Sequence, residues 1–156
     1  MRIAIISVGH KMPAWIQAGF KEYVKRMPPE IRVELTELKP EVREPGKASE
    51  KAKTLEGERI LAAIPGGALT IALDERGKAV STQGLSVMLA DWMRDGTQPV
   101  FVIGGADGLS EAVKERATKL VSLSTLTLPH ALVRVVLAEQ LYRAWSILAK
   151  HPYHRE

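Results

Sequence analysis

The 156-residue sequence contains no cysteine. Disulfide bonds and thiolate chemistry are therefore excluded, and nothing in the composition points to an oxidising compartment. Aromatic residues make up only 5% of the chain, and they form no aromatic-rich platform for stacking on RNA bases. No apolar run approaches the ~20 residues of a membrane span, and the apolar stretch 1–8 is too short for a signal peptide. We therefore expect a cytoplasmic protein that makes no contact with membranes.

The remaining composition is that of an ordinary globular protein. Hydrophobic residues account for 46% of the chain and charged residues for 26%. This length is sufficient for one domain with its own core, so we expect a single domain over 1–156. The net charge of +4 permits attraction to a polyanion, but many proteins with such a charge bind none.

Short apolar runs alternate with amphipathic stretches along most of the chain. We expect strands at 2–8, 31–38, 69–73 and 99–103, and helices at 14–27, 54–63, 82–94, from 111 to about 119, and 131–149. Strict alternation of apolar and polar residues over 31–38 predicts an edge strand. Gly77 is expected in a turn, and the charged stretch 39–53 in a solvated loop. This order predicts an α/β fold, with a mainly parallel sheet covered by helices on both faces.

Three glycines follow the most apolar of these strands. Gly104, Gly105 and Gly108 lie where a strand leads into a helix, which is the edge at which open α/β sheets bind ligands. Glycine allows a ligand to approach the backbone closely. The pattern is neither a dinucleotide fingerprint nor a phosphate loop, and a plain strand-to-helix turn explains it equally well.

The sequence SLSTLTLPH, at 122–130, alternates small hydroxyl residues with leucines before Pro129. Backbone donors and acceptors framed by leucines suit adenine, which needs a few directional hydrogen bonds and an apolar slot. Periodicity alone favours a different interpretation, a strand whose serines and threonines face solvent.

The last helix and the tail after it are unusual. Residues 131–149 are apolar around most of the helix circumference, so the helix must be buried on more than one side, and a second subunit is one way to cover it. The tail HPYHRE contains His154, which can take a proton near neutral pH, and Arg155, which can contact phosphate or stabilise an anion. A basic solvated tail is the alternative. Metal binding is disfavoured, because no carboxylate or cysteine cluster accompanies the histidines.

Four segments together resemble one family. They are VGHKMPAWIQAGFKEYVKR, VFVIGGADGLS, LSTLTLPHALVRVVLAEQLYRAW and the terminal HPYHRE. In this order they are similar to the small bacterial SPOUT-superfamily methyltransferases that methylate N3 of a pseudouridine in large-subunit ribosomal RNA. The resemblance covers essentially the whole chain and is least distinctive between 39 and 63.

The resemblance implies a C-terminal trefoil knot, which general rules of chain connection would have rejected. It implies that the cofactor S-adenosyl-L-methionine binds in the knot region of about 100–156, and that family members form homodimers through the last helix. It places the cofactor-binding role on Leu73, Gly104, Gly105, Leu123, Ser124, Thr125, Leu126, Thr127 and Leu128. It further implies that the substrate is ribosomal RNA within the assembled ribosome.

For the catalytic roles we expect His154 to act as the base and Arg155 as the anion stabiliser or phosphate anchor. Water could instead take the proton, in which case the tail would only position RNA. Two rival functions stay open: a knotted methyltransferase acting on transfer RNA, and a non-catalytic nucleotide-binding module associated with the ribosome. A dinucleotide oxidoreductase is disfavoured, because the first strand leads into VGHKMP rather than a glycine pattern.

Overall fold

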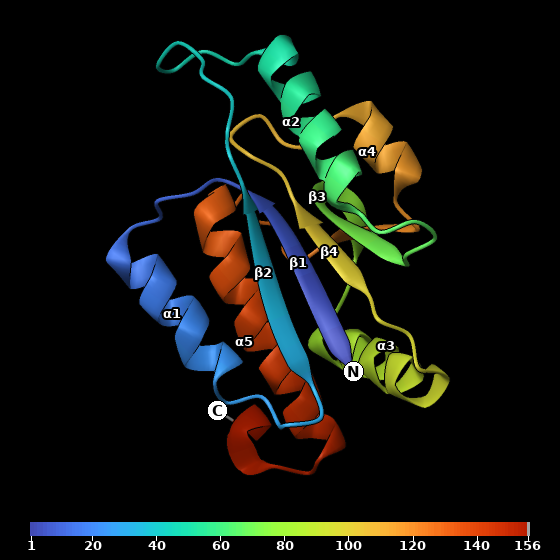
Figure 1. Cartoon of the computed structure of the whole chain (residues 1–156). Coiled ribbons are helices and arrows are strands. Elements are labelled where there is room, and N and C mark those ends of the chain that lie inside the picture. The colour runs from blue at the N-terminus through green and yellow to red at the C-terminus, as the bar shows by residue number, and fades with distance from the viewer. Residues whose placement is uncertain (156) are drawn as a thin grey trace.

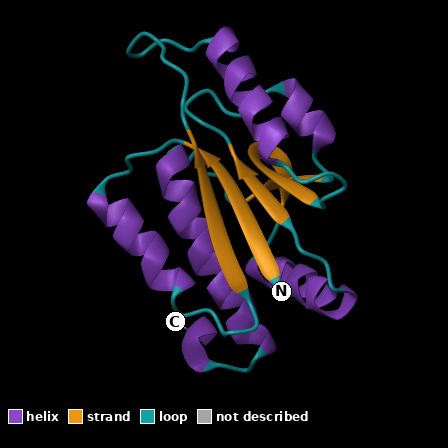
Figure 2. Ribbon diagram, viewed as in Figure 1, coloured by secondary structure: helices purple, strands orange, loops and turns teal. Residues whose placement is uncertain are grey.

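Five parallel strands form one sheet in the computed structural model, which describes residues 1–155 (Figures 1 and 2). They are β1 (Arg2–Val8), β2 (Arg32–Leu38), β3 (Thr70–Ala79), β4 (Val100–Ile103) and β5 (Lys119–Ser122). Their order across the sheet is β2-β1-β4-β3-β5, and each neighbouring pair is parallel. The predicted parallel α/β fold is confirmed, and β2 lies at an edge as the alternation of its residues indicated.

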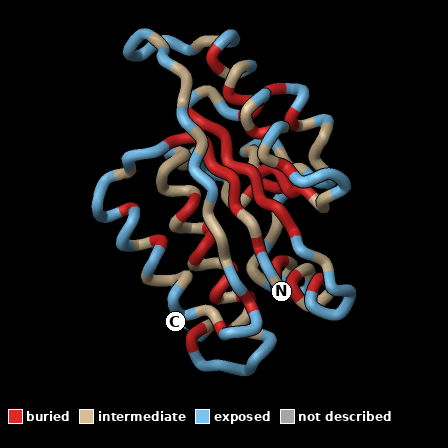
Figure 3. Tube along the Cα trace, viewed as in Figure 1, coloured by how far each residue is buried: buried red, intermediate tan, exposed pale blue. Residues whose placement is uncertain are grey.

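Helices cover both faces of the sheet. They are α1 (Ala14–Val24), α2 (Glu50–Ala63), α3 (Thr82–Asp95), α4 (Glu111–Arg116) and α5 (His130–Leu148), followed by the short 3₁₀ helix η1 (Pro152–Arg155). Side chains of β1 alternate between two buried clusters: Ile3 and Ile5 pack with α1, α3 and α5, whereas Ile6 and Val8 pack with α2 and α4. Figure 3 shows the buried residues concentrated along the strands between these layers.

A serine begins three of the helices. The side chains of Ser49, Ser81 and Ser110 each accept a hydrogen bond from the backbone N–H three residues further on, at the start of α2, α3 and α4 respectively. Such a cap satisfies an N–H group that has no partner within the helix. These helices therefore begin where short serine side chains occur in the sequence.

Two predicted boundaries around the last strand are wrong. The strand predicted to end at residue 73 continues to Ala79 through an irregularity in its pairing with β5. Gly77 is not in a turn, because it lies within β3 directly against the backbone of β5, where a Cβ would come within 2.6 Å of the Val121 nitrogen. The helix predicted from residue 111 to about residue 119 is α4, which ends at Arg116. Lys119 instead begins β5. Strand pairing outweighed the local turn and helix signals at both places.

The close contact of Gly77 with the backbone of β5 predicts a large difference in stability between two glycine substitutions. Gly77→Ala should lower the free energy of unfolding by about 2 kcal/mol or more, because the new methyl group would meet backbone atoms that cannot turn aside. Gly66→Ala is the matched control, since no atom lies within 4 Å of a Cβ at that position. Urea denaturation of both variants checks this, and equal stability of the two would refute the close packing of β3 on β5.

Candidate functional site

A cavity of about 760 Å³ opens at the carboxyl edge of the sheet. Its walls come from residues 73–76 in the irregular part of β3, from residues directly after β4 and β5, and from the first turn of α5. Ligands of open α/β folds bind at this edge, and the volume lies within the roughly 300–1,000 Å³ typical of small-molecule sites. The position and size of the cavity therefore identify it as the candidate ligand site.

Most residues singled out from the sequence lie together in this cavity. The predicted cofactor residues that line it are Leu73, Gly104, Gly105, Leu123, Ser124, Leu126, Thr127 and Leu128. Thr125 belongs to the same loop but is not among the lining residues, and neither His154 nor Arg155 is. The structure thus brings together the expected binding residues and places the expected catalytic ones elsewhere.

The three glycines form a tight turn at the base of the cavity. A Cβ on Gly104 would come within 2.7 Å of the Gly108 carbonyl carbon, so no larger residue fits without a backbone shift. Gly108 has a φ of +80°, in the left-handed region that favours glycine, and its N–H donates to the Gly105 carbonyl at 3.1 Å. The segment 104–108, called the glycine turn below, therefore exposes backbone to the cavity at short range.

The loop 123–128 lies outside the helices and strands. Among residues 1–155, this loop makes no backbone-to-backbone hydrogen bond. Side chains hold it instead: Ser122 Oγ donates to the Ser124 carbonyl at 2.8 Å, and Ser124 Oγ accepts from the Leu126 N–H at 2.9 Å. Free backbone donors and acceptors between leucines are what a flat, hydrogen-bonding ring such as adenine requires.

Charged side chains that the sequence analysis did not single out also line the cavity. Lys114 Nζ lies 3.2 Å from Asp74 Oδ2, and Lys53 of α2 reaches the same space. Burial opposes ionisation of Asp74, but the Arg76 N–H and Lys114 outweigh it and lower the pKa of the Asp74 carboxyl. Asp74 could have been recognised from sequence, since it directly follows a buried strand. Lys114 and Lys53 carry no such local signal.

His130 begins α5 and lines the cavity next to a buried arginine. The Arg134 side chain is 2% exposed; its Nη1 donates to Glu37 Oε2 at 2.6 Å and its Nη2 to the Gly9 carbonyl at 3.1 Å. Burial, followed by the positive charge of Arg134, lowers the pKa of His130. The imidazole is therefore neutral at physiological pH and can accept or donate one hydrogen bond to a ligand.

The tail lies at the opposite end of α5 from the cavity, near the amino ends of the strands (Figure 1). The helix has 19 residues and so is about 28 Å long. Tyr153 holds the tail there: its hydroxyl donates to Glu139 Oε1 at 3.0 Å, and burial and this bond raise the pKa of Tyr153. His154 and Arg155 therefore do not reach the cavity of their own chain.

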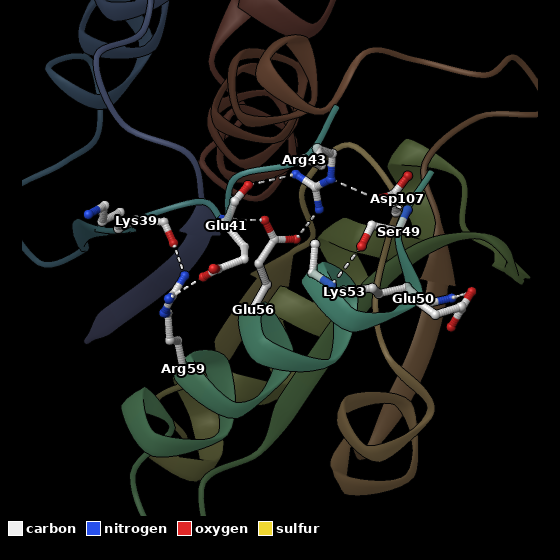
Figure 4. Close-up of polar contacts among 10 residues, drawn as sticks. Lys39, Glu41, Arg43, Ser49, Glu50, Lys53, Glu56, Arg59 and Asp107 are labelled. Atoms are coloured by element: carbon white, nitrogen blue, oxygen red, sulfur yellow. Dashed lines mark hydrogen bonds and ion pairs between the residues drawn. The ribbon is translucent and has the colours of Figure 1, made fainter. Parts of the chain in front are cut away.

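The prediction of a solvated loop over 39–53 is wrong in part. Its last residues, from Glu50, belong to α2, and its Arg43 side chain is only 16% exposed because it contacts Glu56 and Asp107 (Figure 4). These contacts could not be predicted from the charged residues of 39–53 alone, because Glu56 and Asp107 lie outside that stretch.

Two features are absent from residues 1–155. In this part of the chain, no group of three or more His, Asp or Glu side chains could hold a metal ion. No helix there is both long and apolar enough to cross a membrane.

The fold and the cavity define a parallel α/β protein with a ligand site at the carboxyl edge of its sheet. The chain belongs to the SPOUT methyltransferase family, because the family profile described as "Predicted SPOUT methyltransferase" matches residues 1–154. This match confirms the resemblance noted in the sequence.

Similar proteins extend over the same length. A protein of Ralstonia pickettii (strain 12J) named "Ribosomal RNA large subunit methyltransferase H" is 57% identical over 155 residues, which are 99% of each chain. One of the same name from Burkholderia lata is 56% identical with equal coverage. A solved structure of a probable methylase family protein from Haemophilus influenzae Rd KW20 aligns with a TM-score of 0.57 over 97% of this chain and 68% of that one. At 13% identity, this last likeness concerns the fold alone.

The lowered pKa of His130 predicts a pH dependence of stability. The folded chain resists protonation of this imidazole, whereas the unfolded chain protonates near pH 6.5, so stability should fall as pH drops through about 6.5. In His130→Gln this part of the slope should disappear. Urea denaturation between pH 5 and 8 measures it, with His10→Gln, an exposed histidine, as the control. Identical slopes for wild type and His130→Gln would contradict the assignment.

Proposed function

We propose that the chain transfers the methyl group of S-adenosyl-L-methionine to N3 of a pseudouridine in large-subunit ribosomal RNA. The observation that carries this proposal is the 57% identity, over 99% of both chains, to a protein named as a large-subunit ribosomal RNA methyltransferase. The cavity at the sheet edge supports it, because it offers a site for the cofactor. Ribosomal RNA within the assembled ribosome is the proposed substrate, as the resemblance to this family implies. This substrate places the enzyme in the cytoplasm.

The residues of the cavity fit the cofactor. The glycine turn lets a ligand contact backbone directly, since Gly104, Gly105 and Gly108 line the cavity and carry no side chains. The loop 123–128, which makes no backbone-to-backbone hydrogen bond to the rest of residues 1–155, suits adenine together with its leucines, and Leu73 lines the cavity as well. Asp74 and Lys114 add one charge of each sign, which matches a ligand that carries both ammonium and carboxylate groups. We assign the cofactor to Leu73, Gly104, Gly105 and the loop 123–128, including Thr125.

The cofactor, when bound, supplies a methyl group already activated by its sulfonium centre. The protein then has two tasks, to align the target nitrogen and to help its proton leave, because a protonated imide N3 is a poor nucleophile. His154 is the proposed base for that proton. Arg155 stabilises the resulting anion or anchors an RNA phosphate.

We propose that the tail performs this role in the cavity of a second subunit. Within one chain, His130 begins α5, a helix about 28 Å long, and His154 lies beyond the other end of that helix. A two-fold dimer in which two α5 helices pack antiparallel would bring each tail toward the partner's cavity. Half-exposed apolar residues support such pairing, because Leu132, Val136 and Ile147 form one stripe along α5. A homodimer is therefore part of the proposed active form.

We also propose that 1–156 acts as one SPOUT domain whose region of about 100–156 is threaded as a trefoil knot. The position of β4 between β1 and β3 supports this. The path of the chain from β5, at one edge of the sheet, back to α5 supports it as well, because α5 contacts both α1 and α3 on one face of the sheet. Glu156 lies outside the described residues.

Methyl transfer tests the function directly. The protein is incubated with labelled S-adenosyl-L-methionine and, separately, with ribosomes, large subunits, naked ribosomal RNA and transfer RNA from cells that lack this modification. We expect label on assembled ribosomes, at N3 of one pseudouridine. Label on transfer RNA alone would support the rival RNA substrate, and no transfer to any RNA would support the non-catalytic module.

Mixing two inactive variants tests the role of the tail. His154→Ala should lose most turnover while its cofactor affinity, measured by calorimetry, stays near wild type. Thr127→Trp places a bulky group at an exposed position of the cavity wall and should block the cofactor. Co-refolded from equal amounts, the two variants should recover roughly a quarter of wild-type activity, since half the dimers are mixed and each has one intact composite site. No recovery, or full turnover of His154→Ala alone, would rule out a catalytic tail acting across subunits.

A further inference from the structure

Arg43 joins three parts of the chain behind the candidate cofactor site (Figure 4). Its Nη2 donates to Glu56 Oε1 on α2 at 3.0 Å, and its Nε lies 2.9 Å from Asp107 Oδ2 in the glycine turn. Arg43 itself belongs to the segment 39–49, which leads from β2 to α2. We call the three side chains of Arg43, Glu56 and Asp107 the Arg43 clamp.

The clamp is largely removed from solvent. The Glu56 side chain is 1% exposed, and those of Arg43 and Asp107 are 16% and 15% exposed. A buried carboxylate without a partner is strongly destabilising, so Glu56 depends on the guanidinium and on the Glu41 N–H, which donates to its Oε2 at 2.9 Å. The hydrogen bond to Glu56 outweighs burial and raises the pKa of Arg43, which keeps it charged.

One carboxylate of the clamp packs against the glycine turn, and the other belongs to it. A Cβ on Gly105 would lie 3.1 Å from Glu56 Oε1, so this carboxylate packs directly against the turn backbone. Asp107 lines the cavity itself, and its Oδ2 also accepts the Ser49 N–H at 3.1 Å. The glycine turn therefore contacts the Glu56 carboxylate at Gly105 and carries the Asp107 carboxylate itself, and Arg43 contacts both carboxylates.

We propose that Arg43 is a positioning residue, which fixes the glycine turn in its cofactor-binding geometry and couples it to the segment 39–49. Without the guanidinium, the carboxylates of Glu56 and Asp107 repel each other with no positive charge between them, and they relieve this repulsion by moving apart. That movement displaces backbone of the glycine turn, which the cofactor is proposed to contact. Coupling is reciprocal, so cofactor binding in turn stabilises the segment 39–49. The cofactor part of this proposal rests on the proposed function.

The geometry also explains why the residue is an arginine. A planar guanidinium can contact two carboxylates from different nitrogens at the same time, as Arg43 does with Nη2 and Nε. A lysine side chain ends in a single ammonium group, which would contact only one of the two carboxylates of Glu56 and Asp107. Arg43→Lys should therefore restore protein stability more fully than it restores cofactor binding.

The test compares Arg43→Gln and Arg43→Lys with Lys47→Gln. Lys47 lies in the same segment, but within residues 1–155 its side chain pairs with Glu44 alone, and both side chains are exposed. Binding of S-adenosylhomocysteine is measured by calorimetry, and hydrogen exchange of 39–49 and 104–108 is followed with and without this ligand. We expect Arg43→Gln to weaken binding roughly tenfold. The ligand should slow exchange of 39–49 in wild type and Lys47→Gln but not in Arg43→Gln.

Two results would overturn the role of the clamp. They are unchanged affinity in a folded Arg43→Gln protein and the absence of any ligand effect on exchange of 39–49 in wild type. If Arg43→Gln does not fold, Asp107→Asn keeps the buried Arg43–Glu56 pair and should show the same loss of affinity and of ligand-dependent protection. In a folded double variant, the effects of Arg43→Gln and Asp107→Asn should not add, whereas independent structural defects would add.

Failure of the proposed function would look different. If wild type binds no S-adenosylhomocysteine, the cofactor assignment is wrong, and exchange of the ligand-free protein then tests the clamp alone. Faster exchange at 104–108 in Arg43→Gln than in Lys47→Gln would support the clamp in that case. Equal exchange in the two variants would overturn it.

Discussion

The parallel register of β3, β4 and β5 is the constraint on which the site depends. Leu73 of β3 pairs with Ile103 on one side and with Val121 on the other, so β4 and β5 end at about the level of Leu73, where the pairing of β3 becomes irregular. The part of β3 after Leu73 and the segments that follow β4 and β5 therefore lie side by side, although they are up to about 50 residues apart in sequence. Hydrogen bonds between strands thus determine where the glycine turn and the loop 123–128 meet, and the ligand cavity is the space between them.

A buried arginine, Arg134, and a half-buried one, Arg43, then hold the segments around this edge. Arg134 ties α5 to the ends of β1 and β2, through the Gly9 carbonyl and Glu37. Arg43 ties the glycine turn to α2 and to the segment before it. A buried guanidinium without partners is costly, so each arginine tolerates only a narrow range of positions for the groups around it. The two arginines thus restrict where the segments around the cavity can lie, whereas the loop 123–128 makes no backbone-to-backbone hydrogen bond to the rest of residues 1–155.

Local patterns in the sequence predicted the parts of the fold that depend on neighbouring residues. Alternation predicted the edge strand β2, and apolar runs predicted β1 and β4. The close approach of Gly77 to β5 was missed, because a glycine among charged residues has the local pattern of a turn. Arg43 was missed for a similar reason, since its partners lie outside its segment. Most of the expected cofactor residues came together, but nothing in the tail itself revealed that His154 lies beyond the far end of α5 from the cavity.

A crystal structure of the protein with S-adenosylhomocysteine tests the central claim most directly, because it locates the ligand and the second subunit at once. The proposed site predicts the adenine between leucines of 123–128, hydrogen-bonded to their backbone, with the ligand against the glycine turn. The dimer predicts the tail of the second subunit over the position of the transferred methyl group. Ligand bound away from the carboxyl edge of the sheet, or a cavity that no second tail approaches, would contradict this account of the site.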